Sequence, residues 1–283
     1  MSAPLLALLD GSIVDVATPI IRADDLGVVR GDGVFDATLV RHGELRDTDA
    51  HLDRLARSAE ILALPAPDRD GYRRAIAALV EAWDWDAAPE AVARLVLTRG
   101  PEGGGHPPTA YVLLQALSEA VIAERTTGVR VLLLDRGFDG EVVAAMPWLL
   151  PGAKSLSYSI NMAAKRYAHE HGADDVLFVA PSGRLLEGPT STLVLDVDGE
   201  LLTPEQDGIL ASITLEQLER DAPAHGLTVR HAPLTRDDLA RARGGWLISS
   251  GRLASAITSI DGVAYPASPL HDALFTVLEV RAS

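Results

Sequence analysis

The stretch that decides how this chain is interpreted is PGAKSLSY, at residues 151–158, which carries one of only two lysines in the protein. Lys154 stands there between a glycine turn and an apolar-rich segment, where partial loss of hydration would favour the neutral, nucleophilic amine. A solvated lysine at a helix start fits this local sequence equally well. The other lysine, Lys165, lies among charged residues of a helix-like segment and has the pattern of an ordinary surface residue.

The segments on both sides of this stretch alternate between strand-like and helix-like patterns. A polar stretch at 118–128 separates the two regions. We therefore expect two α/β domains, an N-terminal one over residues 1–118 and a C-terminal one over 129–283, with an interdomain linker at 119–128. The predicted strands lie at 13–21, 34–40, 93–98, 111–117, 129–135, 176–180, 193–197, 246–249 and 256–260, the predicted helices at 49–64, 72–83, 161–171, 214–222 and 268–280, and a loop at 100–108.

The composition disfavours several classes of function. A net charge of −15 over 283 residues argues against a nucleic-acid partner or an anionic membrane, because both require a basic surface. The absence of cysteine removes disulfides, thiolate nucleophiles and sulfur-ligated metals. No apolar run reaches the ~18–20 residues of a membrane helix. We expect a soluble, cytoplasmic protein that acts on a small molecule.

Two local patterns that could suggest a metal or nucleotide site have simpler explanations. His169 and His171 are two residues apart, so they do not share a helix face and make a poor metal pair. The sequence GDG at 31–33 lacks the third glycine and the strand-to-helix context of a dinucleotide fingerprint. We therefore expect neither a metal nor a nicotinamide cofactor.

Five further motifs occur in order around Lys154: RGDGVF at 30–35, HLDR at 51–54, LLEGPTST at 185–192, GILASIT at 208–214 and ISSG at 248–251. Each alone could be a turn or a helix surface. In this order and spacing they resemble the class IV pyridoxal-phosphate family, which includes branched-chain and D-amino-acid aminotransferases and aminodeoxychorismate lyase. The resemblance covers nearly the whole chain. It implies the fold-type-IV architecture, with a smaller N-terminal α/β domain and a larger C-terminal α/β domain that contains a pseudo-barrel.

The resemblance implies pyridoxal 5'-phosphate as the cofactor and gives Lys154 the role of the lysine that holds it as a Schiff base. Glu187 matches the glutamate that pairs with the pyridine nitrogen; a carboxylate there keeps the nitrogen protonated, so that the ring can accept electrons. Tyr158 matches a tyrosine that hydrogen-bonds the phenolic oxygen of the cofactor. Without the resemblance, Glu187 would be interpreted as a solvated hairpin residue and Tyr158 as a core residue.

Several residues match family positions that bind the cofactor phosphate. Arg54 matches an arginine that clamps the phosphate, although alone it could be a helix-surface charge. Ile213 and Thr214 match backbone amides that cradle the phosphate, and Ser250 and Gly251 match a second phosphate loop. The sequence TLEQ at 214–217 independently has the form of a capping box, and unpaired N–H groups at a helix N-terminus favour an anion.

Two residues are assigned to substrate binding. Arg99 matches an arginine that binds the substrate carboxylate in D-amino-acid aminotransferases, and a solvated arginine at a strand end is nearly as compatible with the sequence. Asp36 stands where aminotransferases usually carry glutamate and enterobacterial-type lyases carry threonine. Thr192 stands where many relatives carry asparagine. Both Asp36 and Thr192 occupy positions that can tune substrate choice.

The motifs are most similar to those of actinobacterial-type aminodeoxychorismate lyases. Such enzymes release pyruvate from 4-amino-4-deoxychorismate and leave p-aminobenzoate for folate biosynthesis, so the resemblance predicts this lyase activity. The alternative within the family is an aminotransferase of D-amino acids or branched-chain L-amino acids. A cofactor-binding protein without catalysis is disfavoured because Lys154 and Glu187 are both present. The resemblance also implies a homodimer.

Overall fold

The computed structural model describes residues 2–103 and 106–279, and the chain divides into two compact units. Unit 1 contains the residues up to Ser118 together with Gly152–Tyr158. Unit 2 contains Glu119–Pro151 and the residues from Ser159 onward. The chain therefore leaves unit 1 at residue 118, and it returns to unit 1 for the short segment that carries Lys154. This segment, Gly152–Tyr158, is called the lysine segment below.

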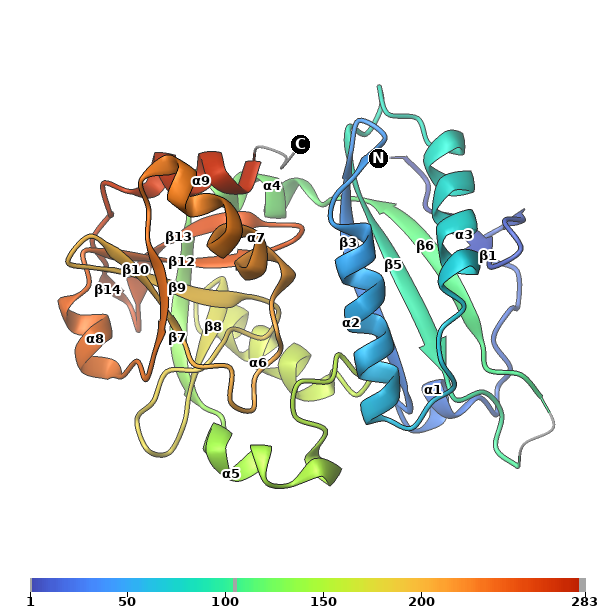
Figure 1. Cartoon of the computed structure of the whole chain (residues 1–283), viewed down its shortest axis with the longest axis horizontal. Coiled ribbons are helices and arrows are strands. Elements are labelled where there is room, and N and C mark those ends of the chain that lie inside the picture. The colour runs from blue at the N-terminus through green and yellow to red at the C-terminus, as the bar shows by residue number, and fades with distance from the viewer. Residues whose placement is uncertain (1, 104–105, 280–283) are drawn as a thin grey trace. The chain divides into compact units, whose positions relative to one another are not determined.

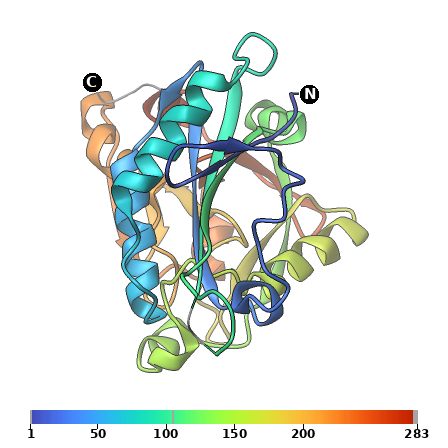
Figure 2. The same cartoon turned by 90° about the vertical axis from the view of Figure 1, so that its right-hand side faces the viewer.

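Unit 1 is built on a sheet that is six-stranded over the described residues, with strand order β2-β1-β6-β5-β3-β4 and antiparallel pairing throughout. Two helices pack side by side on one face of it (Figure 1, Figure 2). The elements are β1 (Leu5–Leu8), β2 (Ile13–Val14), α1 (Leu26–Val29), β3 (Gly33–Arg41), β4 (Glu44–Leu45), α2 (Thr48–Ile61), α3 (Arg69–Ala82), β5 (Glu90–Thr98) and β6 (Ala110–Ala116).

The sequence explains why α2 and the β3–β4 hairpin form where they do. Leu52, Leu55 and Ala59 are three and four residues apart, so they share one helix face, and all three are buried against the sheet. The hairpin turn uses His42 and Gly43, with φ of 49° and 80°. Two consecutive positive φ angles are what a type I′ turn requires, and this turn matches the twist of the flanking strands.

Unit 2 contains a mixed sheet with the order β11-β10-β9-β12-β13-β7-β8, to which β14 adds beside β13. The β7–β8, β13–β7 and β10–β11 pairs are parallel, and the other pairs are antiparallel. The strands are β7 (Val129–Asp135), β8 (Asp175–Val179), β9 (Thr192–Val197), β10 (Glu200–Pro204), β11 (Val229–Ala232), β12 (Gly244–Ser249), β13 (Leu253–Ile260) and β14 (Val263–Ala264).

A short segment at 184–187 closes this sheet on itself. On one side Leu186 donates its N–H to the Phe178 carbonyl of β8 (2.9 Å), and on the other side Leu185 donates to the Leu234 carbonyl, just after β11 (2.8 Å). The two outer strands are thus bridged, which gives the pseudo-barrel that the resemblance implied. Its interior is apolar and includes Leu193 and Leu247, both fully buried.

Unit 2 also contains helices, several of which pack on strands of this sheet. They are α4 (Glu119–Thr127), α5 (Gly140–Ala144), η1 (Pro147–Leu149), α6 (Ser159–Glu170), α7 (Ile213–Asp221), η2 (Ala222–His225), α8 (Arg236–Arg241) and α9 (His271–Glu279). Most of the residues predicted as an interdomain linker form α4 instead. Residues 119–127 contain no glycine or proline that would interrupt a helix, and the helix ends at Gly128, whose φ is +69°. The end of the predicted closing helix, at Val280, lies outside the described residues.

Two other predictions need correction. The predicted strand at 13–21 is confirmed only for β2, because the Thr18 N–H turns back to the Asp15 carbonyl (2.8 Å) and ends the extended run. The capping box at 214–217 is wrong in register: α7 is capped by Ser212, whose hydroxyl accepts from the Leu215 N–H (3.2 Å). Ser212 takes the extended conformation of an N-cap, so the helix begins one residue earlier than predicted.

Candidate active site

The backbone of Lys154 is held between two elements of unit 1. Its N–H donates to the Ser58 hydroxyl on α2 (3.1 Å), and its carbonyl accepts from the Phe35 N–H of β3 (3.0 Å). The lysine segment also pairs with the end of β3 through the Leu156 N–H, which donates to the Gly33 carbonyl (2.8 Å). It therefore acts as an extra antiparallel edge of the sheet, and the position of Lys154 is fixed by sheet pairing.

The side chain of Lys154 lies between two aromatic rings. Its Nζ is 4.5 Å from the ring centroid of Phe35 and 5.2 Å from that of Tyr158. The two rings meet edge to face at 5.3 Å. Aromatic faces attract an ammonium group and also shield it from water. Tyr158, predicted from the resemblance, is thus placed beside Lys154, and Phe35 is a neighbour that the sequence did not single out.

Glycines make this close approach possible. A Cβ built on Gly33 would stand 2.7 Å from both the Leu97 carbonyl oxygen and the Leu156 Cδ1, and one on Gly31 would stand 2.6 Å from the Ser157 hydroxyl. Contacts this short do not occur between real side chains, so larger residues would push the lysine segment away. The GDG pattern therefore has a packing role here, in place of a nucleotide-binding one.

Arg54 lies on α2 and forms a two-point ion pair with Asp36 of β3. The Nε and Nη2 of Arg54 donate to the two carboxylate oxygens of Asp36 (2.8 and 2.7 Å), and His51 Nδ1 lies 2.7 Å from the same carboxylate. Burial would raise the pKa of Asp36, but the charge and hydrogen bonds of Arg54, followed by those of His51, hold it well below its ordinary range. The pair fixes the plane of the guanidinium.

The surroundings of Asp36 do not favour the predicted contact with substrate. Asp36 is fully buried, and both of its oxygens are engaged by Arg54 and His51 within unit 1. A charged group without exposure can influence a ligand only through its partners. The geometry therefore makes Asp36 a positioning residue for Arg54.

Arg99 is also engaged by protein groups. Its Nε and Nη2 donate to the carboxylate of Asp32 (2.6 and 3.1 Å), and its Nη2 and Nη1 donate to the carbonyls of Leu62 and Ala63 (2.7 and 3.2 Å). These carbonyls follow the last turn of α2, where a cation is favoured by the helix dipole. In this structure Arg99 caps α2. The loop that follows contains Gly104 and Gly105, which lie outside the described residues.

Glu187 lies in unit 2, at the end of the segment that closes the pseudo-barrel. Its carbonyl accepts from the Phe178 N–H (3.0 Å), and its carboxylate accepts from the Leu210 N–H (3.4 Å). The turn that follows is tight: a Cβ on Gly188 would stand 2.4 Å from the Ser191 hydroxyl. Glu187 is thus on a fixed backbone and half-buried, unlike a freely solvated hairpin residue.

The predicted phosphate-binding residues of unit 2 come together. Ile213 and Thr214 form the first turn of α7, whose leading N–H groups have no acceptor within the helix. The Thr214 hydroxyl lies 3.5 Å from that of Ser250, in the turn between β12 and β13. Ile213, Thr214, Ser250 and Gly251 are called the phosphate cradle below. Hydroxyls and unpaired N–H groups beside a helix N-terminus are the donor set that a phosphate requires.

Arg136 and Asn161 lie near the turn that follows Glu187, and the sequence motifs did not assign either residue to the site. The Arg136 guanidinium stacks over the ring of Phe178 (4.6 Å), and its Nη2 donates to Asn161 Oδ1 (3.4 Å). Asn161 in turn donates to the carbonyl of Pro189 (2.7 Å), in the turn after Glu187. The stretch DRG at 135–137 offered no motif that would have marked this arginine.

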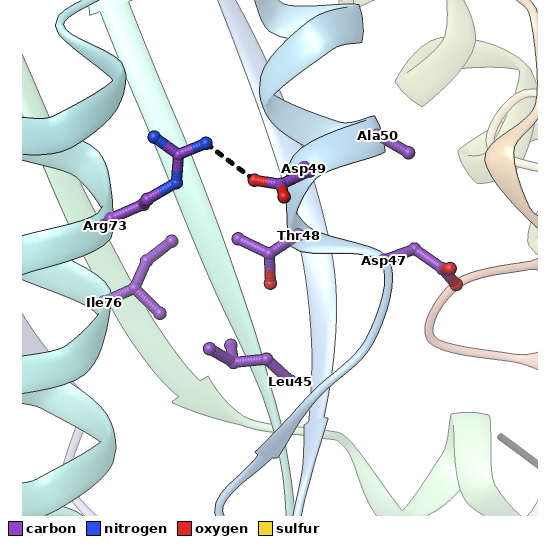
Figure 3. Close-up of a pocket in the computed structure, with 7 residues that line it drawn as sticks. All are labelled: Leu45, Asp47, Thr48, Asp49, Ala50, Arg73 and Ile76. Carbon is purple, nitrogen blue, oxygen red and sulfur yellow. Dashed lines mark hydrogen bonds and ion pairs between the residues drawn. The ribbon is translucent and has the colours of Figure 1, made fainter. Parts of the chain in front are cut away.

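Unit 1 also carries a hollow on its surface (Figure 3). It has a volume of about 510 Å³ and lies between the N-terminal end of α2 and α3. Arg73 and Asp49, an exposed ion pair at 2.8 Å, face each other across it. None of the predicted site residues lines it, so it is not assigned to the reaction.

Over residues 2–103 and 106–279, no helix has both the length and the apolar character needed to cross a membrane. Over the same residues, histidines and acidic side chains do not gather in a group of three or more that could hold a metal ion.

Comparison with known proteins agrees with this geometry. The model of the family described as amino-transferase class IV matches residues 33–260. A bifunctional aminodeoxychorismate lyase / D-amino acid transaminase from Mycobacterium tuberculosis is 41% identical over 276 residues, which cover 95% of each chain. A PLP-bound hypothetical aminotransferase from the same species has a TM-score of 0.93 at 40% identity, covering 98% of both chains. It is also known in a form with alpha-ketoglutarate and PMP.

A fold IV transaminase from Curtobacterium pusillum is similar as well, with a TM-score of 0.91 at 39% identity over 99% of this chain and all of that one. The family match covers most of the chain, and the relatives match it from end to end. The chain therefore belongs to the class IV aminotransferase family of pyridoxal-phosphate-dependent enzymes.

Proposed function

We propose that this protein is a 4-amino-4-deoxychorismate lyase, which releases pyruvate and leaves p-aminobenzoate. The observation that carries this proposal is the 41% identity, over 95% of both chains, to a relative whose name gives this lyase activity. The placement of Lys154 between two aromatic rings supports it, because the substrate carries an unsaturated six-membered ring that such surfaces can accommodate.

Each residue of the candidate site has a separate role in the proposed reaction. Pyridoxal phosphate, when bound, supplies a cationic ring that accepts the electron pair of a broken C–H bond. Lys154 is the attachment point, and its Nζ takes and returns the proton. Glu187 offers a carboxylate that would keep the ring nitrogen protonated. Arg54 and the phosphate cradle are the groups proposed to bind the phosphate, and Asp36 orients Arg54.

A second candidate function is transamination of D-amino acids. The same relative is named as both a lyase and a D-amino acid transaminase, so one protein of this family carries both reactions. Both reactions would begin when the Lys154 amine removes a proton from the carbon that carries the substrate amine. The lyase would then eliminate a β-substituent, whereas the transaminase would need Lys154 to deliver that proton to a second position; the bound cofactor would supply the electron sink in both cases.

A product assay with three substrates separates these candidates. The holoenzyme is given aminodeoxychorismate, D-alanine with 2-oxoglutarate, or L-leucine with 2-oxoglutarate, and p-aminobenzoate or the transferred amino group is quantified. We expect p-aminobenzoate to form faster than either amino transfer, with D-alanine the better amino donor. Rapid amino transfer without p-aminobenzoate would reject the lyase assignment, and preference for L-leucine would reject the D-specific alternative.

We also propose that the protein is a homodimer. Within each unit, large apolar side chains that are close in sequence are exposed, and grouped apolar side chains favour contact with another chain. Val28 and Val29 are 61% and 53% exposed in α1 of unit 1, and Trp148 is 72% exposed in η1 of unit 2. A molar mass of about twice 30.0 kDa, measured by light scattering during size-exclusion chromatography, is expected. A mass near 30.0 kDa would reject it.

A further inference from the structure

The turn between β12 and β13 supplies one side of the phosphate cradle but is not held by its own backbone alone. Ser250 lies in this turn and places its hydroxyl 3.5 Å from that of Thr214. Within the turn, the Arg252 N–H donates to the Ser249 hydroxyl (3.3 Å). Leu253 has a φ of +60°, a left-handed conformation that is unfavourable for a leucine. Groups outside the turn must therefore stabilise its shape.

Arg125 of α4 binds the backbone of this turn. Its Nη2 donates to the Gly251 carbonyl (2.8 Å) and its Nε to the Arg252 carbonyl (3.2 Å). Arg125 is only 7% exposed, so these are buried, charge-assisted hydrogen bonds. Because a peptide group is planar, fixing two successive carbonyls fixes the orientation of both peptide planes. The conformation of the turn is thus set by a side chain from α4.

The preceding residue of α4 binds the same turn through a side chain. Glu124 accepts from Arg252 Nε (2.9 Å), and Arg252 Nη2 donates to the fully buried Asp175 of β8 (2.8 Å). Arg252 is 4% exposed. Removing one partner from a buried ion pair is costly, so such a pair defines position strongly.

Helix α4 itself is fixed close to β13. A Cβ built on Gly128, at the end of α4, would stand 2.5 Å from the Ala256 carbonyl oxygen. Only glycine permits this approach together with its φ of +69°. The guanidinium of Arg125 therefore starts from a fixed backbone.

We propose that Arg125 is a positioning residue for the cofactor phosphate, holding the β12–β13 turn so that the Ser250 hydroxyl stands beside Thr214. This inference rests on the proposed assignment of the phosphate cradle, and it assigns no contact between Arg125 and the phosphate. In this proposal α4, the first helix of unit 2, orients the phosphate cradle through Arg125.

The test compares two aldehydes that differ only in the phosphate. Apo-protein is titrated with pyridoxal phosphate and with pyridoxal, and each dissociation constant is read from the visible absorbance of the bound aldehyde. In Arg125→Met, which keeps side-chain length and removes every donor, we expect affinity for pyridoxal phosphate to fall about tenfold or more, roughly the loss of one charge-assisted hydrogen bond. Affinity for pyridoxal should stay within about twofold of the wild type.

Arg130→Met is the matched control. Arg130 is in the same unit but 56% exposed, and it pairs with Asp174 at 2.7 Å. It should leave both affinities unchanged. Should Arg125→Met fail to fold, as judged by circular dichroism, Arg125→Lys keeps the charge with a single donor group and should show a smaller loss of the same selective kind.

Three outcomes overturn the inference or its premise. Equal weakening of both aldehydes by the Arg125 variants would make Arg125 a general structural residue. Unchanged affinities would remove it from the site altogether. If the wild type itself bound pyridoxal phosphate no better than pyridoxal, the assignment of the phosphate cradle would fail, and the inference with it.

Discussion

The lysine segment and the phosphate cradle are built by different physical means. The lysine segment is held by an isolated antiparallel bridge to β3, against glycines that leave no room for a side chain. The phosphate cradle combines a helix N-terminus with a hairpin turn, and hydroxyl and guanidinium hydrogen bonds set its shape. The position of the proposed reactive amine therefore depends on close backbone packing, whereas the proposed anion site depends on hydrogen-bond donors. Substitutions should affect the two regions differently.

Removing the amine should have the largest effect. Lys154→Ala is expected to lower turnover by at least about a thousandfold, because it removes both the attachment point and the proton-transfer group. Lys165→Arg keeps the pairing with Asp175 (3.3 Å) and should remain active. Borohydride reduction of the holoenzyme followed by peptide mass analysis should place the cofactor on Lys154. A label on Lys165 would contradict this assignment.

Breaking the buried ion pair between Asp36 and Arg54 should have the second-largest effect. Asp36→Asn leaves the Arg54 charge buried without its partner, which is expected to cost about 3–5 kcal/mol in the free energy of unfolding, measured in urea. The same change at the exposed Asp24, paired with Arg22 at 2.9 Å, should lower the free energy of unfolding far less, because solvent screens that pair. Equal losses in the two variants would show that the buried pair has no special weight.

The same pair predicts a pH dependence. Folding lowers the pKa of Asp36, so its stabilisation is fully present above the ordinary value of about 4 and is lost as the pH falls below it. The gap in stability between the wild type and Asp36→Asn should be constant from about pH 6 to 8 and narrow below about pH 4. A gap that widens in acid would refute this interpretation.

Adding a side chain at Gly33 should lower the free energy of unfolding less than the loss of the Asp36 carboxylate does. It should also displace Lys154. Gly33→Ala places a methyl group 2.7 Å from a backbone oxygen and should cost about 1–3 kcal/mol. The displaced lysine segment should also bind pyridoxal phosphate more weakly. Gly172→Ala is the control, because its Cβ would meet nothing within 4 Å and only its φ of +76° is strained. If both variants kept wild-type affinity for pyridoxal phosphate, close packing at Gly33 would not be needed to position Lys154.

The smallest effect is expected at the cap of α7. Ser212→Ala removes the acceptor of the Leu215 N–H and should cost about 1 kcal/mol, whereas Ser212→Gly should cost only about a few tenths of that, since glycine is tolerated at an N-cap. Thermal unfolding measures the difference. Identical melting temperatures for the two variants would show that the Ser212 hydroxyl does not stabilise the helix.

Much of the fold was predictable because local patterns decide it. The predicted helix at 49–64 corresponds to α2, whose buried Leu52, Leu55 and Ala59 have helical spacing. The linker could not be distinguished from a helix, because α4 is largely exposed and carries little apolar periodicity. Its buried residue is Arg125, whose partners lie more than a hundred positions away.

The candidate site could be proposed only through the family motifs. Thr214 and Ser250 are 36 positions apart, and nothing local in either motif indicates that their hydroxyls meet. The partner of Asp36 was missed although a signal existed. A carboxylate within an apolar strand requires a buried cationic partner, and Arg54 and His51 lie on α2, the helix that packs on β3.

The segment that closes the pseudo-barrel links the integrity of unit 2 to the orientation of one side chain. Successive residues of an extended segment point to opposite faces, so a slip of one residue in the pairing between 184–187 and β8 would turn the Glu187 carboxylate to the other side. Such a slip would have to break the bond to Phe178 and the bond to Leu234 together. Hydrogen bonds on both sides of residues 184–187 therefore fix the strand register. They keep the Glu187 carboxylate on one face of the segment while the pseudo-barrel is closed.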